Sequence, residues 1–71
     1  MNQYQRIINY IEDYGSITSM QAFEDLGITK LATRIGEMER AGMIELQHIR
    51  ETGKNRFGET CSYIRYYKEE I

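Results

Sequence analysis

Cysteine and histidine are almost missing from this 71-residue sequence, which has one of each, Cys61 and His48. A lone cysteine cannot form an internal disulfide, and these two residues cannot supply the ligands of a zinc site or a histidine-based catalytic group. We therefore expect no metal, no cofactor and no enzymatic activity. Cys61 is expected to be a small, partly buried strand residue.

Long apolar stretches are missing as well. No run approaches the length that crosses a bilayer, and the N-terminus has no basic segment followed by an apolar one. We expect no membrane association and a cytoplasmic location. With 41% hydrophobic and 28% charged residues, the chain is expected to form a single globular domain over residues 1–71.

Positive charge is scarce at the start of the chain and concentrated later. The formal net charge is −2 overall, but residues 1–28 carry −3, residues 29–68 carry +3, and Glu69 and Glu70 supply the rest. The distribution of charge decides which partners a surface attracts. The basic second part is therefore where an anionic partner is expected.

Three stretches predict helices, at about residues 3–14, 19–26 and 30–41, and a glycine follows each. Thr18 and Gln21 have the spacing of a capping box at the second helix, and Thr29 is expected to cap the third. The side chains expected to face inward are Tyr4, Ile7, Ile8, Ile11, Tyr14, Ala22, Phe23, Leu26, Leu31, Ile35 and Met38. Gly36 is unfavourable inside a helix, so we expect it to permit close packing against another element.

The last third predicts a β-hairpin with strands at about residues 43–51 and 60–67. Asn55 and Gly58 fit the first and fourth places of a type I turn in its loop. Residues 16–18 are long enough only for a short bridging strand. The order of elements predicts an α+β fold, the winged helix-turn-helix, with three helices and a C-terminal hairpin as the wing.

In this fold the polar side of the third helix faces the major groove of DNA. The residues predicted to contact DNA from the helix are Thr29, Lys30, Thr33, Arg34 and Glu37, and those from the wing are Lys54, Asn55 and Arg56. The wing residues would reach the DNA backbone or the minor groove. Phe57 is expected to fold back on the sheet; the alternative is contact with a sugar or base. Each charged residue taken alone also fits an ordinary solvated surface.

The stretch GSITSMQAFEDLGITKLATRIGEMERAG, followed by KNRFGETCSYIRYYK, resembles the small winged helix-turn-helix proteins of bacteriophages and prophages. The resemblance covers about Tyr4 to Tyr67. It implies a sequence-specific or architectural DNA-binding protein of a phage or mobile element, acting as a transcriptional regulator and associated with the nucleoid of a bacterial cell. Glu51 and Glu59 depart from the pattern, because acidic residues beside the hairpin loop oppose phosphate contact.

Two questions stay open at this level. One small domain reaches few phosphates, so a second copy is expected, through the first helix (Tyr10, Tyr14), through the hairpin edge, or side by side on DNA. The competing function is a phage protein-binding module that inhibits a host factor such as a defence nuclease. Its acidic surface would comprise Glu12, Asp13, Glu24, Asp25, Glu69 and Glu70.

Overall fold

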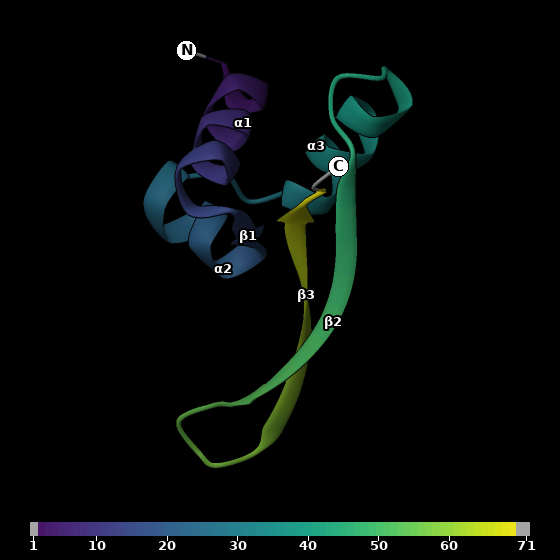
Figure 1. The fold of residues 1–71 in the computed structure, drawn as a ribbon. Helices are drawn as coiled ribbons and strands as arrows, with labels where there is room; N and C mark the ends of the chain where they lie inside the picture. Colours follow the sequence, from purple (N-terminus) through teal and green to yellow (C-terminus); the bar gives the residue numbers. More distant parts are fainter. Residues whose placement is uncertain (1, 70–71) are drawn as a thin grey trace.

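The computed structural model describes residues 2–69, in which helices precede a long β-hairpin (Figure 1). The elements are α1 (Gln3–Tyr14), β1 (Ser16–Thr18), α2 (Ser19–Gln21), η1 (Ala22–Leu26), α3 (Leu31–Arg40), β2 (Leu46–Lys54) and β3 (Thr60–Lys68). The helices gather near one end of the hairpin, and its other end extends away from them. The structure confirms the predicted α+β class.

The hairpin belongs to a three-stranded antiparallel sheet with the order β1-β3-β2. Ile17 of β1 lies opposite Tyr66 of β3, and Tyr66 lies opposite His48 of β2. Residues 16–18 therefore do form a bridging strand, which ties the segment between α1 and α2 to the hairpin. β2 begins at Leu46, later than expected.

α1 is an amphipathic helix with a cap at each end. The Asn2 side chain accepts a backbone hydrogen bond in the first turn, and Gly15 ends the helix with a left-handed φ of 84°. Ile7 and Ile11, four residues apart, are buried on one side. The prediction that Tyr14 faces inward is wrong, because its side chain is 72% exposed. It is the last helical residue, at the point where the chain turns away toward β1.

The second helix starts with the predicted capping box. Thr18 Oγ1 accepts from the backbone N–H of Gln21, and Gln21 Oε1 accepts from the N–H of Thr18. After one turn the helix widens to π geometry in η1 and ends at Gly27, whose φ is 70°. Ala22 is buried, but the inward position predicted for Phe23 is wrong, since it is 58% exposed. Ala22 turns its side chain into the core, and the next residue, Phe23, turns its side chain toward solvent.

α3 turns the predicted side toward the core, with Leu31, Ile35 and Met38 buried. Lys30 occupies its N-cap position and no side chain caps it, so the prediction for Thr29 is wrong. Gly36 does not serve close packing against another element. The nearest atom to a Cβ placed there is Nη1 of Arg40, at 3.3 Å, in the same helix.

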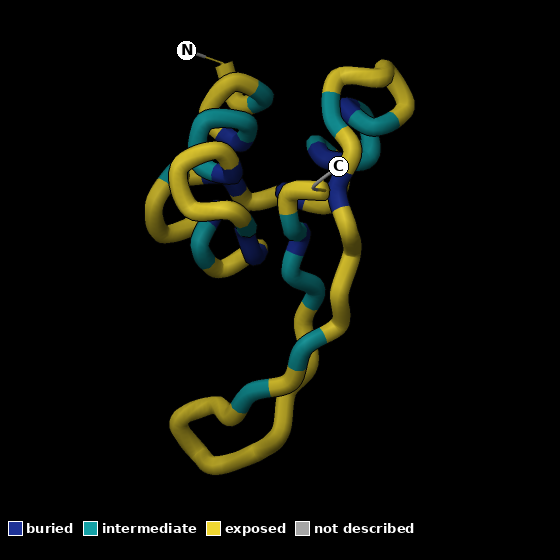
Figure 2. Tube along the Cα trace, viewed as in Figure 1, coloured by how far each residue is buried: buried dark blue, intermediate teal, exposed yellow. Residues whose placement is uncertain are grey.

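The buried side chains gather where the helices meet the near end of the hairpin (Figure 2). The core hydrophobic residues are Ile7, Ile11, Ile17, Ala22, Ile28, Leu31, Ile35, Met38, Leu46 and Tyr66. No residue from 47 to 65 is buried, and we call residues 50–64 the outer hairpin. Cys61 lies in it and is exposed, contrary to prediction, because no helix covers that part of the sheet.

Candidate nucleic-acid interface

The outer surface of α3 carries exposed polar side chains. Lys30, Thr33 and Arg40 are exposed, and neither Lys30 nor Arg40 takes part in an ion pair within the described chain. The guanidinium of Arg40 lies over Gly36, where a side chain would crowd it. This surface is therefore cationic and open to a partner, and it has no side chain at Gly36. Arg40 is a candidate that the predicted site residues did not include, although its place on the polar arc could be read from the helical period.

Two predicted recognition residues are turned instead toward the start of α1. Arg34 Nε donates to Gln3 Oε1 at 2.9 Å, and Arg34 Nη1 donates to Glu37 Oε1 at 2.8 Å. The hydroxyl of Tyr4 donates to the same Glu37 oxygen at 2.9 Å. These contacts join α3 to α1 at the side of the helix. Arg34 and Glu37 thus share an arc with Lys30, but their side chains are engaged with α1 and with each other.

The electrostatics of this junction favour its charged form. The hydrogen bond from Arg34, followed by that from Tyr4, lowers the pKa of Glu37 below its ordinary value. The same contact with Glu37 raises the pKa of Arg34. About a third of each side chain in this ion pair is exposed, at 31% and 35%. The ion pair is consequently exposed to solvent and is tied to α1 through Gln3 and Tyr4. Because its two charges offset each other, it offers little net charge to an anionic partner such as a phosphate.

The near end of the hairpin lies beside the C-terminal end of α3. His48 Nε2 and Glu39 Oε2 are 2.9 Å apart, which joins β2 to the last turns of the helix. Alternate residues of a strand share one face, so Arg50 and Lys54 project from the same face of β2 as His48. Both are exposed. Arg50, which is not among the residues predicted to contact DNA, thus lies on the face of β2 that contacts α3, and it donates to Ser62 Oγ at 3.3 Å.

Asn55 shapes the hairpin loop. Its Oδ1 accepts from the backbone N–H of Phe57 at 2.9 Å and of Glu59 at 3.1 Å, and its Nδ2 donates to Glu59 Oε1. The N–H of Gly58 donates to the carbonyl of Asn55 at 3.0 Å, as the predicted type I turn requires. The amide of Asn55 is therefore engaged within the loop, where it maintains the turn.

Phe57 stands at the tip of this loop and is 79% exposed. The prediction that it folds back on the sheet is wrong. It lies beyond the last strand pair, Lys54 with Thr60, so no sheet face remains for it to cover. Its neighbour Arg56 is exposed and makes no ion pair within residues 2–69.

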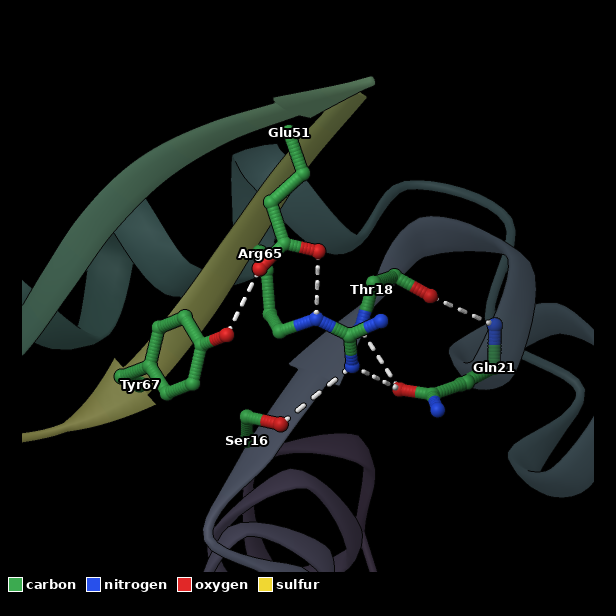
Figure 3. A network of polar contacts seen from close by, with 6 residues as sticks. All are labelled: Ser16, Thr18, Gln21, Glu51, Arg65 and Tyr67. Atoms are coloured by element: carbon green, nitrogen blue, oxygen red, sulfur yellow. Dashed lines mark hydrogen bonds and ion pairs between the residues drawn. The ribbon is translucent and has the colours of Figure 1, made fainter. Parts of the chain in front are cut away.

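A polar network fixes the hairpin where it leaves the helical body (Figure 3). Arg65 Nε donates to Glu51 Oε1 at 2.9 Å, and Arg65 Nη1 reaches Ser16 Oγ at 3.3 Å and Gln21 Oε1 at 3.5 Å. Tyr67 donates its hydroxyl to Glu51 Oε2 at 2.6 Å. The bonds from Tyr67 and Arg65 lower the pKa of Glu51. The charge of Glu51, which was expected to oppose phosphate contact, is thus neutralised by Arg65. Arg65 also contacts Gln21 in the capping box of α2.

The acidic residues of the competing hypothesis are solvent-facing, and one of them is engaged. Glu12, Asp13, Glu24, Asp25 and Glu69 are exposed, while Glu70 lies outside the described residues. Asp25 accepts from the hydroxyl of Tyr10 at 2.7 Å, which raises the pKa of Tyr10 to about 12. The ring of Tyr10 lies 4.6 Å from that of Tyr14, so the two tyrosines contact each other along α1.

Residues 2–69 contain no cluster of His, Cys, Asp and Glu suited to a metal ion, and none of their helices is long and apolar enough to span a membrane. A family model described as a winged helix-turn-helix domain matches residues 2–67. The match takes in every helix and all but the last residue of the hairpin strands. No curated protein and no solved structure matches the chain.

Proposed function

Because the chain belongs to the winged helix-turn-helix domain family, whose members are generally non-enzymatic DNA-binding modules, we propose that it binds double-stranded DNA through α3 and the outer hairpin. An α-helix fits the major groove, where base edges present distinguishable donors and acceptors. The hairpin reaches the neighbouring backbone or minor groove.

The observation that carries this proposal is a set of exposed cations on α3 and the adjoining hairpin. It consists of Lys30, Arg40, Arg50, Lys54 and Arg56. None of them forms an ion pair within the part of the chain that the structure describes. In a protein of net charge −2, such a local surplus attracts an anionic polymer that the total charge alone would not.

We assign different roles to the predicted recognition residues. Lys30 and Thr33, with Arg40, contact base edges or phosphates, and Thr29 contacts a phosphate ahead of the helix. Arg34 and Glu37 act as positioning residues, because their contacts with Gln3 and Tyr4 hold α3 against α1. In the wing, Lys54 and Arg56 contact DNA while Asn55 maintains the loop.

The test is the affinity for random duplex DNA measured across a salt series. Each phosphate contact releases counterions, so the affinity should fall steeply as salt rises. Arg40→Ala, Arg50→Ala and Arg56→Ala should each reduce the slope of log K against log salt by about 1. Lys68→Ala is the matched control, because Lys68 is an exposed cation outside the proposed set and lines a hollow together with Ile8 and Glu12 of α1.

Two results would overturn the proposal. One is the absence of duplex binding at low salt, which would direct attention to a protein partner. The other is a salt slope that Lys68→Ala reduces as much as the three arginine variants do, because the attraction would then come from net charge and not from this surface.

The resemblance to phage and prophage proteins favours a regulatory role on the DNA of a mobile element. One domain of this size contacts few phosphates, so we propose that two or more copies bind together. Titration of a duplex of about 20 base pairs, with the mass of the complex measured at saturation, gives the number of copies. A saturating stoichiometry of one protein per duplex would contradict this part of the proposal.

A further inference from the structure

Phe57 is more exposed than the other large hydrophobic side chains among residues 2–69. It is 79% exposed, against 72% for Tyr14, which has an aromatic neighbour in Tyr10. Within the described chain Phe57 has no ring partner. An isolated phenyl ring at a loop tip contributes nothing to the core, so its position requires another explanation.

The loop fixes the backbone at Phe57. The backbone N–H of Phe57 donates to Asn55 Oδ1, and the N–H of Asn55 donates to the carbonyl of Glu59 at 3.0 Å. Lys54 Nζ lies 3.4 Å from the carbonyl of Gly58. A loop backbone that is ordered before binding loses less conformational entropy when it contacts a partner.

The chemistry around Phe57 indicates the kind of partner. Lys54 and Arg56 are exposed on the same loop, together with Glu59, which accepts from Asn55 Nδ2. The loop keeps a net positive charge, so a partner that encloses the ring must also accept positive charge. The interior of stacked base pairs, bordered by phosphates, offers both an apolar slot and negative charge. The hairpin loop extends away from the helical body (Figure 1), so a residue of this loop can reach DNA beyond the groove that α3 would occupy.

We propose that Phe57 inserts between neighbouring base pairs from the minor groove and bends the DNA. This inference rests on the proposed DNA-binding function and adds an architectural role to it. Apolar wedges of this kind unstack a base step and kink the duplex by about 20–90° toward the major groove. Arg56 and Lys54 hold the adjacent phosphates while the ring occupies the step.

The experiment measures bending separately from binding. Ligase-catalysed circularisation of a duplex of about 100 base pairs is slow, because DNA is stiff over roughly 150 base pairs. The wild-type protein should accelerate it. Phe57→Ala should abolish the acceleration and weaken binding about tenfold, consistent with the loss of one stacked contact, with the salt slope unchanged. Phe57→Leu should retain part of the bending, because leucine also serves as a wedge.

Phe23→Ala is the control, since it removes an exposed phenyl ring from η1 in the helical body and should leave circularisation unchanged. If Phe57→Ala bends DNA as well as the wild type, or if the bound wild type does not bend DNA, the wedge is refuted while DNA binding stands. If the wild type binds no duplex in the salt series, the proposed function itself fails and the wedge fails with it.

Discussion

The helical body and the outer hairpin are held in place by different interactions. Among residues 2–69, ten hydrophobic side chains are buried, and all of them lie outside residues 50–64. The outer hairpin depends instead on the backbone ladder between β2 and β3 and on the bonds of Asn55. The body therefore supplies most of the stability, and the hairpin is free to use its side chains for a partner.

The same contrast appears between two arginines. Arg34 belongs to the body, and its guanidinium is occupied by Glu37 and Gln3. Arg56 belongs to the outer hairpin and makes no ion pair within the described residues. Substitutions in the two regions should therefore separate stability from binding, which the following predictions test.

The largest effect is expected in the body, for Ile35→Ala. Ile35 is 1% exposed on the core side of α3, and its truncation should cost about 2–5 kcal/mol of unfolding free energy. A 71-residue domain has only about 4–11 kcal/mol in total, so the variant should be close to unfolding. Urea denaturation followed by circular dichroism measures the loss. A change below about 1 kcal/mol would show that this core tolerates a cavity. It would then weaken the inference that the helical body, and not the outer hairpin, supplies most of the stability.

A smaller effect of opposite sign is expected for Gly36→Ala. Alanine is favoured over glycine inside a helix by about 1 kcal/mol, and the added methyl meets only the guanidinium end of the exposed Arg40. The variant should therefore be more stable by up to about 1 kcal/mol in urea. Ala32→Gly, at an exposed position of the same helix, should lose a similar amount. Destabilisation by Gly36→Ala would mean that Arg40 cannot move aside.

The architecture could be predicted because the local sequence patterns along the chain all favour the same fold. The Thr18–Gln21 capping box and the spacing of Leu31, Ile35 and Met38 are local patterns, and the structure contains them. Thr29 failed as a cap because α3 starts one residue later, at Leu31. Helix ends depend on single backbone conformations that the helical period does not determine.

The candidate site was harder to predict, because the helical period predicts which way a side chain points but not which residues it contacts. Arg34 and Glu37 share an arc with Lys30, yet only the folded chain brings Gln3 and Tyr4 beside them. These contacts join residues more than 30 positions apart. The exposure of Phe57 likewise depends on the residues at which β2 and β3 end, which the local sequence does not determine.

At the junction of the two regions, stability should depend on pH through Glu51. The hydrogen bonds from Tyr67 and Arg65 lower its pKa, so the folded state favours the carboxylate. This contribution is fully present above the ordinary carboxyl pKa and is lost as the pH falls through the lowered one. Glu51→Gln should therefore be less stable than the wild type at pH 7, with the difference narrowing toward pH 3.

Thermal unfolding at the two pH values measures this difference. Glu45→Gln is the control, because Glu45 is exposed and outside the network of Arg65, and it should behave like the wild type at both. A difference for Glu51→Gln that stays constant between pH 7 and pH 3 would exclude the carboxylate as its source.

The smallest effect on stability is expected at the hairpin tip, for Arg56→Ala. Its side chain is exposed and makes no ion pair within residues 2–69, so the unfolding free energy should change by less than about 0.5 kcal/mol. Asn55→Ala, one residue away, removes two bonds to backbone N–H groups and should cost about 1 kcal/mol. Urea denaturation of both variants tests the contrast within a single loop. If Arg56→Ala were as destabilising as Asn55→Ala, Arg56 would be part of the folded framework, and its weakened DNA binding could no longer be assigned to a lost phosphate contact.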